Sequence, residues 1–371
     1  NGLIQINNDI FTEEEREYLR VNRFWVDDNE DEIALLEREI NHNIQKRQKE
    51  LELTIALTNY CNFSCVYCYQ NKNEKLMTTE VANMIIEKID RILNDNIFEG
   101  INIHYFGGEP LLNIPVLIYL DENIKKITDK IGTVYKAFLT TNGSMLSKEL
   151  LQKVKFSSIQ LTFDGLEKTH DRLRVSDHFH FKEEIELIEN IMNFSQAKVL
   201  LRTNICKENK DEIIALHKYI FEKFGNERIE INPNRTIKYH QDDSFEMLSV
   251  QEYAEVAYQI KLLWSEQKGK FELPVPRSTP CKFPYGNAYA ISPEGYCTFC
   301  SGSMDQEKKY FFDVDIENKK MFSVRKECKK CNILPLCLGG CIIQYNLRAG
   351  ACTYEKYELK NILISYIKHI S

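Results

Sequence analysis

The pattern of apolar positions changes twice along the chain. Residues 1–50 are polar and charged, and apolar residues at three-to-four spacing predict one helix near residues 30–49. From Leu51, short β-prone runs alternate with segments whose apolar residues recur at helical spacing. Strands that alternate with helices are typical of parallel β/α units. We therefore predict an α/β fold in which residues 51–235 form an open, partial (β/α)6 barrel, with strands at 51–57, 101–106, 134–140, 158–163, 198–204 and 228–232.

Beyond residue 235 the alternation stops. A helix is predicted near residues 250–267, and a Pro-rich passage follows it, so residues 236–279 are interpreted as a helical bridge. Residues 280–353 show little periodicity and many cysteines, which predicts a loop-rich domain held together by metal rather than by apolar burial. A last helix, within residues 354–371, is expected to pack on the barrel through Leu359, Leu363, Tyr366 and Ile370.

Composition excludes several classes of partner. The net charge is −7, from 48 Lys and Arg against 55 Asp and Glu, so we expect no nucleic-acid partner. No apolar run reaches about 18 residues and the start carries no export signal, so we expect no membrane partner and a cytoplasmic location. The chain begins with Asn1 rather than Met, so residues 1–50 are interpreted as a lead-in whose natural start could be absent. Whether a leader-binding domain preceded this lead-in is left open.

Twelve cysteines in a chain without an export signal indicate metal ligands or catalytic thiols rather than disulfides. Three of them, Cys61, Cys65 and Cys68, lie within eight residues directly after the first predicted strand. Three thiolates at this spacing can hold three irons of a cubic cluster and leave the fourth iron without a protein ligand. Thiolates suit zinc as well, so the spacing alone leaves the metal open.

Other polar motifs follow the next three predicted strands. They are Gly107–Pro110, Thr141–Ser144 and Thr162–Gly165. In barrels of the TIM type, the carboxyl ends of parallel strands meet at one mouth, which is where such folds place their active sites. In the first of these motifs, two glycines are expected to let the backbone approach a ligand. The sequence therefore predicts a site where four strand ends converge.

The motif Cys-x3-Cys-x2-Cys after the first strand, with Gly-Gly-Glu-Pro after the second, resembles the radical S-adenosylmethionine (SAM) enzymes. The resemblance implies that Cys61, Cys65 and Cys68 bind a [4Fe-4S] cluster and that SAM chelates its fourth iron. It also implies residues that contact SAM: the turn would meet the amino group, Tyr67 would line the adenine, and three polar residues would lie near the ribose and methionine ends. These SAM contacts are Tyr67, Gly107, Gly108, Glu109, Pro110, Asn142, Thr162 and Asp164.

The cysteines near the C-terminus are similar in spacing to the SPASM domain of the same superfamily, which carries two auxiliary [4Fe-4S] clusters. The pattern runs Cys-x13-Gly-x4-Cys, then Cys-x2-Cys-x5-Cys-x3-Cys, then a final Cys. The resemblance implies three [4Fe-4S] clusters in the whole chain. It assigns one auxiliary cluster to Cys328, Cys331, Cys337 and Cys352, and the other to Cys281, Cys300 and Cys341.

Some residues keep two interpretations. Cys297, three residues before Cys300, is expected to complete the auxiliary cluster assigned to Cys281, Cys300 and Cys341. In the alternative, one iron of that cluster has no protein ligand and is open to a substrate. Arg202, in the fifth strand, points into the barrel and would meet the SAM carboxylate or a peptide group. His104 is expected to be a satisfied core residue, Cys206 a buried small hydrophobe, and residues 183–189 a solvated helix face. The alternative that all the cysteine groups bind zinc explains neither the three-Cys group nor the Gly-Gly-Glu-Pro turn.

The resemblance implies an oxidoreductase that cleaves SAM reductively to a 5′-deoxyadenosyl radical, with an electron donor such as ferredoxin or flavodoxin. SPASM proteins most often act on peptides or proteins. Sulfatase maturases usually show Gln before Gly-Gly-Glu-Pro and Asp after the Gly-x4-Cys cysteine, where this chain has Phe106 and Ser301. We therefore favour a maturase of ribosomally made peptides that forms a thioether or other crosslink. The alternatives are formylglycine formation of the sulfatase-maturase type and a non-catalytic iron-sulfur electron carrier.

Overall fold

The computed structural model describes residues 12–21, 30–70, 72–95, 98–225, 227–238, 244–269, 271, 273–298, 300–303, 309–314, 321–341 and 352–370. One mixed sheet organises this part of the chain, with the strand order β6-β5-β4-β3-β2-β1-β7-β8-β9. Its first six strands are parallel and follow one another in chain order. These strands are β1 Glu50–Ala56, β2 Gly100–Phe106, β3 Val134–Thr140, β4 Phe156–Thr162, β5 Lys198–Ile205 and β6 Ile229–Arg235. The predicted partial barrel is confirmed.

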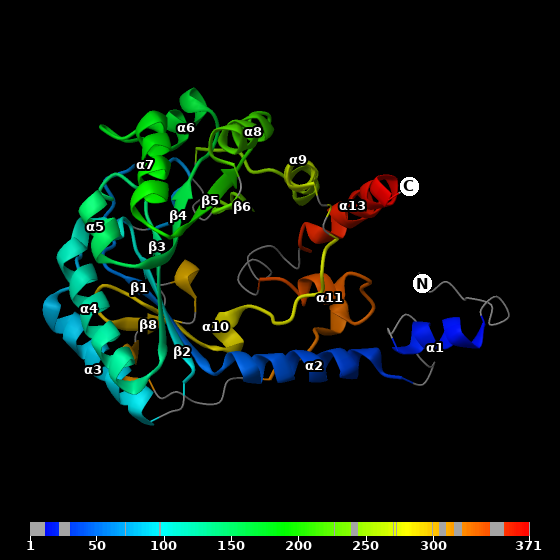
Figure 1. The fold of residues 1–371 in the computed structure, drawn as a ribbon, viewed down its shortest axis with the longest axis horizontal. Coiled ribbons are helices and arrows are strands. Elements are labelled where there is room, and N and C mark those ends of the chain that lie inside the picture. Colours follow the sequence, from blue (N-terminus) through cyan, green and yellow to red (C-terminus); the bar gives the residue numbers. More distant parts are fainter. Residues whose placement is uncertain are drawn as a thin grey trace.

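Helices cover the outer face of this curved sheet (Figure 1). They are α3 Thr79–Asp95, α4 Ile114–Ile131, α5 Lys148–Lys153, α6 Glu167–Leu173, α7 Phe181–Phe194 and α8 Ile213–Phe224. Alternate residues of each strand pack against them. In β5, for example, Val199 and Leu201 belong to the main hydrophobic core, while Leu200 and Arg202 are only partly buried and face the inside of the barrel. The period of two leaves a ring of half-buried polar side chains in the lumen.

Three further strands extend the sheet beyond β1 into the cysteine-rich region. They are β7 Asn287–Ile291, β8 Tyr296–Thr298 and β9 Lys309–Tyr310. β7 pairs with β1 in parallel, with Leu51 opposite Asn287. Polar alternation does not reveal this strand, because all five of its residues are buried. The cysteine-rich region is thus joined to the barrel through main-chain hydrogen bonds.

The N-terminal helix α2 Glu32–Arg47 supports the cysteine-rich region (Figure 1). Its buried Ile40 and Ile44 pack with Phe322, Val324, Leu334 and Leu338. The Asn41 side chain also donates to the Phe322 carbonyl at 2.9 Å and accepts from the Phe322 N–H at 2.7 Å. The predicted lead-in therefore contains a helix that packs against residues 321–341 and stabilises them. A shorter helix, α1 Glu13–Val21, precedes it.

The bridge and the C-terminal segment form two helices that pack on each other, α9 Val250–Lys268 and α13 Glu355–Ile370. An ion pair joins Lys261 to the buried Glu358. The predicted apolar stripe of the last helix is wrong by one position: Ile362 is buried, whereas Leu363 is 43% exposed. This helix packs chiefly against α9 and not against the strands of the barrel as expected. None of the described helices is long and apolar enough to cross a membrane.

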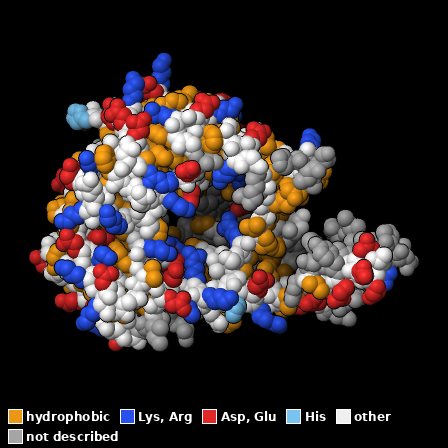
Figure 2. Space-filling view, in the orientation of Figure 1, with side chains coloured by type: hydrophobic (Ala, Val, Ile, Leu, Met, Phe, Trp, Pro, Cys, Tyr) orange, Lys and Arg blue, Asp and Glu red, His pale blue; other side chains and the backbone are white. Residues whose placement is uncertain are grey.

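Short helical turns complete the described chain. They are the 3-10 segments η2 Pro110–Asn113, η3 Ser301–Ser303, η4 Phe311–Asp313 and η5 Lys326–Cys328, and the single turns α10 Lys282–Tyr285 and α11 Leu334–Cys337. In the space-filling view the molecule is hollowed in its middle, between the barrel and the cysteine-rich region, with Lys and Arg side chains around the rim (Figure 2). The mouth of the barrel thus opens toward the second group of cysteines.

Candidate active site at the mouth of the barrel

The loop that carries Cys61, Cys65 and Cys68 leaves the end of β1 and lies against the segment after α6. Ser64 N–H donates to the Val175 carbonyl at 2.8 Å, and Val66 N–H donates to the Leu173 carbonyl at 3.0 Å. The three thiols lie within electrostatic range of one another. Burial raises the pKa of Cys65 to about 11. Burial thus favours the neutral thiol. A bound metal would instead favour the thiolate, because coordination deprotonates a thiol.

The two glycines of the Gly-Gly-Glu-Pro turn let it lie against the backbone that leads into this loop. Gly108 N–H donates to the Thr58 carbonyl and Glu109 N–H to the Tyr60 carbonyl, each at 2.8 Å. A Cβ on Gly107, whose φ is +137°, would stand 2.3 Å from the Thr58 oxygen, and one on Gly108 would stand 2.2 Å from the Tyr60 oxygen. The expected close approach is therefore made to the chain itself, where it fixes the start of the cysteine loop.

The Glu109 carboxylate is fully buried and ties the second strand end to the third. It accepts hydrogen bonds from the Thr141 hydroxyl at 2.7 Å, from the Asn142 N–H at 2.6 Å and from the Leu111 N–H at 3.0 Å. Burial raises the pKa of this carboxyl, and the hydrogen bonds from Asn142 and Thr141 oppose the rise. With three donors on its two oxygens, Glu109 positions the loop after β3. Pro110 begins η2 directly after it.

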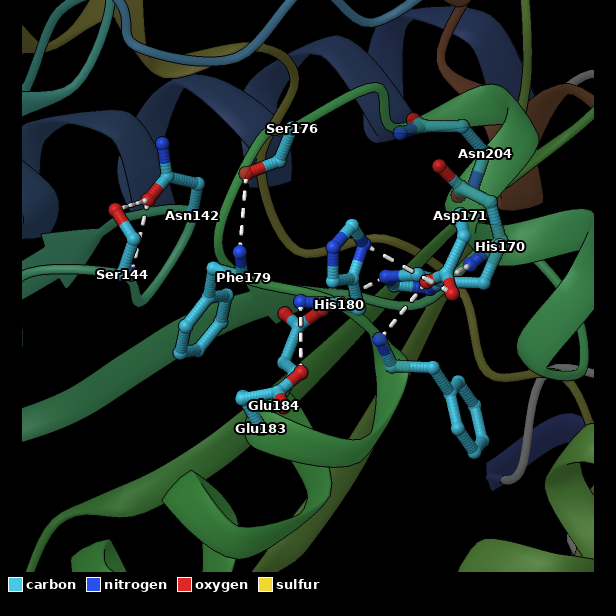
Figure 3. Close-up of polar contacts among 12 residues, drawn as sticks. Asn142, Ser144, His170, Asp171, Ser176, Phe179, His180, Glu183, Glu184 and Asn204 are labelled. Carbon is cyan, nitrogen blue, oxygen red and sulfur yellow. Dashed lines mark hydrogen bonds and ion pairs between the residues drawn. The ribbon is translucent and has the colours of Figure 1, made fainter.

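The Asn142 side chain reaches the cysteine loop from the end of β3. Its Nδ2 donates to Asn62 Oδ1 at 2.8 Å and lies 3.8 Å from Cys61 Sγ. Its Oδ1 accepts from the N–H and the hydroxyl of Ser144, at 3.0 and 2.7 Å (Figure 3). The structure therefore places the Asn142 side chain beside the first cysteine of the loop.

The end of β4 meets the last part of the cysteine loop. Tyr67 donates its hydroxyl to the buried Asp164 carboxylate, whose other oxygen accepts the Asn204 N–H at 2.7 Å. The Tyr67 ring packs with Phe245 and with Cys206, which is fully buried as predicted. Thr162, at the end of the strand, is buried too. Tyr67, Thr162 and Asp164 are thus brought together at one side of the mouth.

A buried charged group behind Asp164 was missed by the sequence analysis. His170 Nε2 lies 3.1 Å from Glu184 Oε2, and both side chains are at most 2% exposed (Figure 3). The Asp164 N–H faces His170 Nδ1 at 3.5 Å. The prediction that residues 183–189 form a solvated face is therefore wrong for Glu184. Its place three residues after Phe181 and four before Ile188, both buried, puts it on the apolar stripe of α7.

Arg174, in the same group, is a buried cation beside the cysteine loop. Its guanidinium lies 5.3 Å from the centre of the Phe63 ring, and it interacts electrostatically with Cys65, Tyr67, Glu184 and Asp164. Within the described ranges, its Nε has no hydrogen-bond partner. A buried guanidinium with an unused donor is suited to an anionic ligand.

Four of the C-terminal cysteines meet around one cavity. Cys328, Cys331, Cys337 and Cys352 line a space of about 380 Å³. Cys281 and Cys341 also lie within electrostatic range of each other. Cys297, in contrast, is 4% exposed and pairs with Ile291 in the sheet, and its side chain belongs to the main core with Phe311. No three Cys, His, Asp or Glu side chains of the described chain stand as close as the ligands of one small ion, and a cubic cluster requires wider spacing.

Comparison with known proteins identifies the barrel. Residues 55–220 match the model of the Radical SAM superfamily. These residues form a radical SAM domain. Among curated proteins, the radical SAM cyclopropyl synthase TigE of Paramaledivibacter caminithermalis is 23% identical over 372 aligned residues, covering 88% of this chain and 76% of that protein. An uncharacterized protein of Methanocaldococcus jannaschii, MJ0907, is 36% identical over 124 residues, which are 31% of this chain and only 39% of that protein.

Solved structures resemble both the radical SAM domain and the region after it. Native anSMEcpe with bound AdoMet superposes with a TM-score of 0.67 at 18% identity, covering 86% of this chain and all of that one. Streptococcus suis SuiB bound to S-adenosylmethionine gives a TM-score of 0.57 at 18% identity, over 92% of this chain and 85% of that one. At such identities the likeness concerns the fold. A radical SAM fold implies SAM and a [4Fe-4S] cluster, and the relatives support an enzyme.

Inside the radical SAM domain, two further predicted residues line the lumen. Arg202 is partly buried and donates from Nε to Asn204 Oδ1 at 2.9 Å. His104 lies with Nε2 2.7 Å from the Thr140 hydroxyl, and burial together with the Lys282 ammonium lowers the pKa of His104 to about 4. It is satisfied, as predicted, but it borders a cavity of the barrel rather than the outer core.

Proposed function

We propose that the protein is a peptide maturase. It cleaves SAM reductively to a 5′-deoxyadenosyl radical and removes hydrogen from a ribosomally made peptide, to form a thioether or another crosslink. The convergence of four strand ends on the loop with Cys61, Cys65 and Cys68 carries the proposal, because every motif that the radical SAM resemblance assigns to SAM lies on these ends. An electron carrier would have no use for SAM-binding motifs on these strand ends.

The residues present fit the implied cofactors. Cys61, Cys65 and Cys68 would hold one [4Fe-4S] cluster, which supplies one electron to SAM when bound. Arg174 would take the SAM carboxylate, since it is the buried cation nearest the loop with an unused donor. Arg202, which lies on the lumen face, would then meet a peptide group, the second of its two predicted targets. Gly107, Gly108 and Glu109 hold in place the loops that would surround the SAM amino group.

The cysteine-rich region supports a role beyond SAM cleavage. The cavity lined by Cys328, Cys331, Cys337 and Cys352 matches the ligand set that the SPASM resemblance implies for one auxiliary cluster. Cys281, Cys300 and Cys341 would hold the other. We interpret Cys297 as a core residue, because its side chain faces the outer layer of the sheet with Ile291 and Phe311. That interpretation leaves the second auxiliary cluster with three cysteine ligands.

The reaction balances with one electron entering and one leaving. An electron from a donor such as ferredoxin or flavodoxin breaks a carbon–sulfur bond of SAM, which gives methionine and the 5′-deoxyadenosyl radical. The radical takes one hydrogen atom from a C–H bond of the peptide. A second hydrogen would leave from the acceptor, such as a Cys thiol, as a proton and an electron, and an auxiliary cluster held by Cys328, Cys331, Cys337 and Cys352 would take that electron as the new bond closes. The peptide loses two hydrogens.

A peptide substrate is favoured by the relatives and by local sequence. The structure of SuiB bound to its precursor peptide SuiA resembles this chain with a TM-score of 0.57 at 17% identity. Phe106 and Ser301 stand where sulfatase maturases usually have Gln and Asp. A short open reading frame next to this gene would supply the peptide for an assay.

The decisive experiment uses anaerobically reconstituted protein with dithionite and SAM. We expect 5′-deoxyadenosine by chromatography from the wild-type protein and none from Cys65→Ala. A fully reconstituted wild-type protein that forms no 5′-deoxyadenosine would contradict the enzyme assignment. Mass spectrometry of the neighbouring peptide then tests the substrate: a loss of two hydrogens indicates a crosslink, and no change in mass contradicts one.

A further inference from the structure

The lumen of the barrel contains a cavity of about 350 Å³ that no SAM contact uses. The inner faces of β1 to β5 and the first residue of α10 line it, with Glu52, Asn102, His104, Phe138, Thr140, Ser158, Gln160, Leu200 and Lys282 as side chains. Its upper edge is Thr140, the last residue of β3. The next two residues, Thr141 and Asn142, are held by Glu109 beside Cys61. The edge of this cavity is therefore continuous along the chain with the loop that contacts Cys61.

The two charged side chains of the cavity neutralise each other. Lys282 Nζ lies 2.6 Å from Glu52 Oε2, and Arg47 contacts the other oxygen of Glu52 at 3.0 Å from outside the lining. Burial opposes ionisation of Glu52, but Lys282 and Arg47 outweigh it and lower the pKa of this carboxyl. An incoming ammonium would meet Lys282, and an incoming carboxylate would have to compete with Glu52 for Lys282 and Arg47. A buried charge without a partner of its own costs several kcal/mol.

The remaining polar groups are uncharged, and some of their hydrogen-bonding capacity is unused. Thr140 Oγ1 is shared by His104 Nε2 at 2.7 Å and by Gln160 Nε2 at 3.4 Å, and Gln160 Oε1 accepts from Asn232 at 3.3 Å. The two bonds of Gln160 are long and therefore weak. Within the part of the chain that the structure describes, the Ser158 hydroxyl has no hydrogen bond.

These groups set what the cavity can bind. An apolar ligand would leave the Ser158 hydroxyl and the Gln160 amide without partners, at the usual cost of desolvating a polar group. A neutral ligand that both donates and accepts would satisfy them, with Phe138 and Leu200 as apolar walls. We propose that this cavity binds an uncharged hydrogen-bonding side chain of the peptide substrate, namely a carboxamide. The proposal rests on the proposed function for its peptide.

The test measures binding to the reconstituted enzyme in the presence of SAM, with N-acetyl amino-acid N-methylamides as probes. We use the glutamine, glutamate, lysine and leucine derivatives and follow them by calorimetry or ligand-observed NMR. The glutamine probe should bind at least about tenfold more tightly than the other three, as expected of a site built from hydrogen-bonding groups. Gln160→Leu should remove most of this preference. Gln259→Leu, on the exposed face of α9, is the matched control and should keep it.

Three results would overturn the proposal: no binding of the glutamine probe, equal or tighter binding of a charged or apolar probe, or an unchanged preference in Gln160→Leu. If Gln160→Leu does not fold, Ser158→Ala replaces it with the same expectation. The 5′-deoxyadenosine assay is run on the same wild-type preparation. Product without probe binding contradicts this proposal alone, whereas a lack of product contradicts the proposed function whatever the probes do.

Discussion

Glu109 Oε2 accepts the Asn142 N–H at 2.6 Å in the buried interior of the barrel mouth, and Asn142 Nδ2 lies 3.8 Å from Cys61 Sγ. The carboxylate after the second strand thus acts on the cysteine loop through the loop after the third. This makes Glu109 a positioning residue. Its side chain accepts hydrogen bonds from Thr141, Asn142 and Leu111, so a contact of this turn with SAM would be made by its backbone.

Glu109→Gln tests this role. One of the carboxylate oxygens becomes an NH2 group that cannot accept from Asn142 or Thr141, and a lost charge-assisted hydrogen bond costs about 1.5–3 kcal/mol. We expect 5′-deoxyadenosine formation to fall about tenfold or more. Iron content should be retained, because no cysteine is changed. Glu99→Gln, which alters only a surface pair with Lys49, is the control. Full activity of Glu109→Gln would show that the tie is dispensable.

Gly108→Ala tests the close approach of the two loops. The added methyl group would stand 2.2 Å from the Tyr60 carbonyl oxygen, which is backbone and cannot turn aside. The cysteine loop must shift, and we expect the variant to lose the iron of the SAM cluster, measured by iron content and electron paramagnetic resonance. Gly132→Ala is matched: it adds a methyl group in open space at a positive φ. Gly132→Ala should keep its iron, and equal iron in both variants would contradict the packing argument.

Arg174→Gln tests the buried cation. Removal of the guanidinium takes away the buried cation beside Glu184 and Asp164 and, under the proposed function, the positive partner of the SAM carboxylate. We expect SAM to bind at least about tenfold more weakly, measured by equilibrium dialysis, and the KM for SAM to rise more than kcat falls. The neighbouring Arg172 is exposed, and Arg172→Gln should bind SAM as the wild type does. If Arg174→Gln binds SAM with unchanged affinity, the SAM carboxylate is assigned to Arg202 instead of Arg174.

The C-terminal cysteines are separated by iron content. Cys337→Ala removes one lining residue of the four-cysteine cavity and should lower the iron content by about one cluster. Cys297→Val replaces a core side chain by one of similar size, and we expect full iron and an unchanged paramagnetic spectrum. If Cys297→Val loses iron as Cys337→Ala does, Cys297 is a cluster ligand and our interpretation of the core position is wrong.

A buried histidine gives the protein a pH-dependent signal. Burial lowers the pKa of His217 to about 4, and its Nδ1 accepts from Trp264 Nε1 at 2.9 Å. Because this pKa lies below the ordinary 6.5, the unfolded chain takes the proton first, and stability is lost as the pH falls from 6.5 toward 4. With Trp25→Phe as background, Trp264 fluorescence should stay constant from pH 8 to about 5.5 and be quenched near 4. A midpoint near 6.5 would contradict the burial.

The sequence by itself determined the alternation of six strands and their helices, and the motifs at four strand ends. It did so because buried strands and amphipathic helices impose their own periods, and because parallel strands point their carboxyl ends the same way. The resemblance to the SPASM domain likewise grouped Cys328, Cys331, Cys337 and Cys352, and in the structure these four cysteines line one cavity.

Only the tertiary structure decided which of these residues are buried together. Glu184 reads as part of a charged run, yet it lies inside because α7 turns that face toward His170. β7 shows no polar alternation because both of its faces are covered. Cys297 lies in the adjacent strand β8 and is buried in the same core. The hydrogen bond from Asn142 to Glu109 joins residues that are 33 positions apart, so local sequence propensity does not predict it. Periodicity reports the face that a residue occupies, and only the folded chain reports what lies opposite that face.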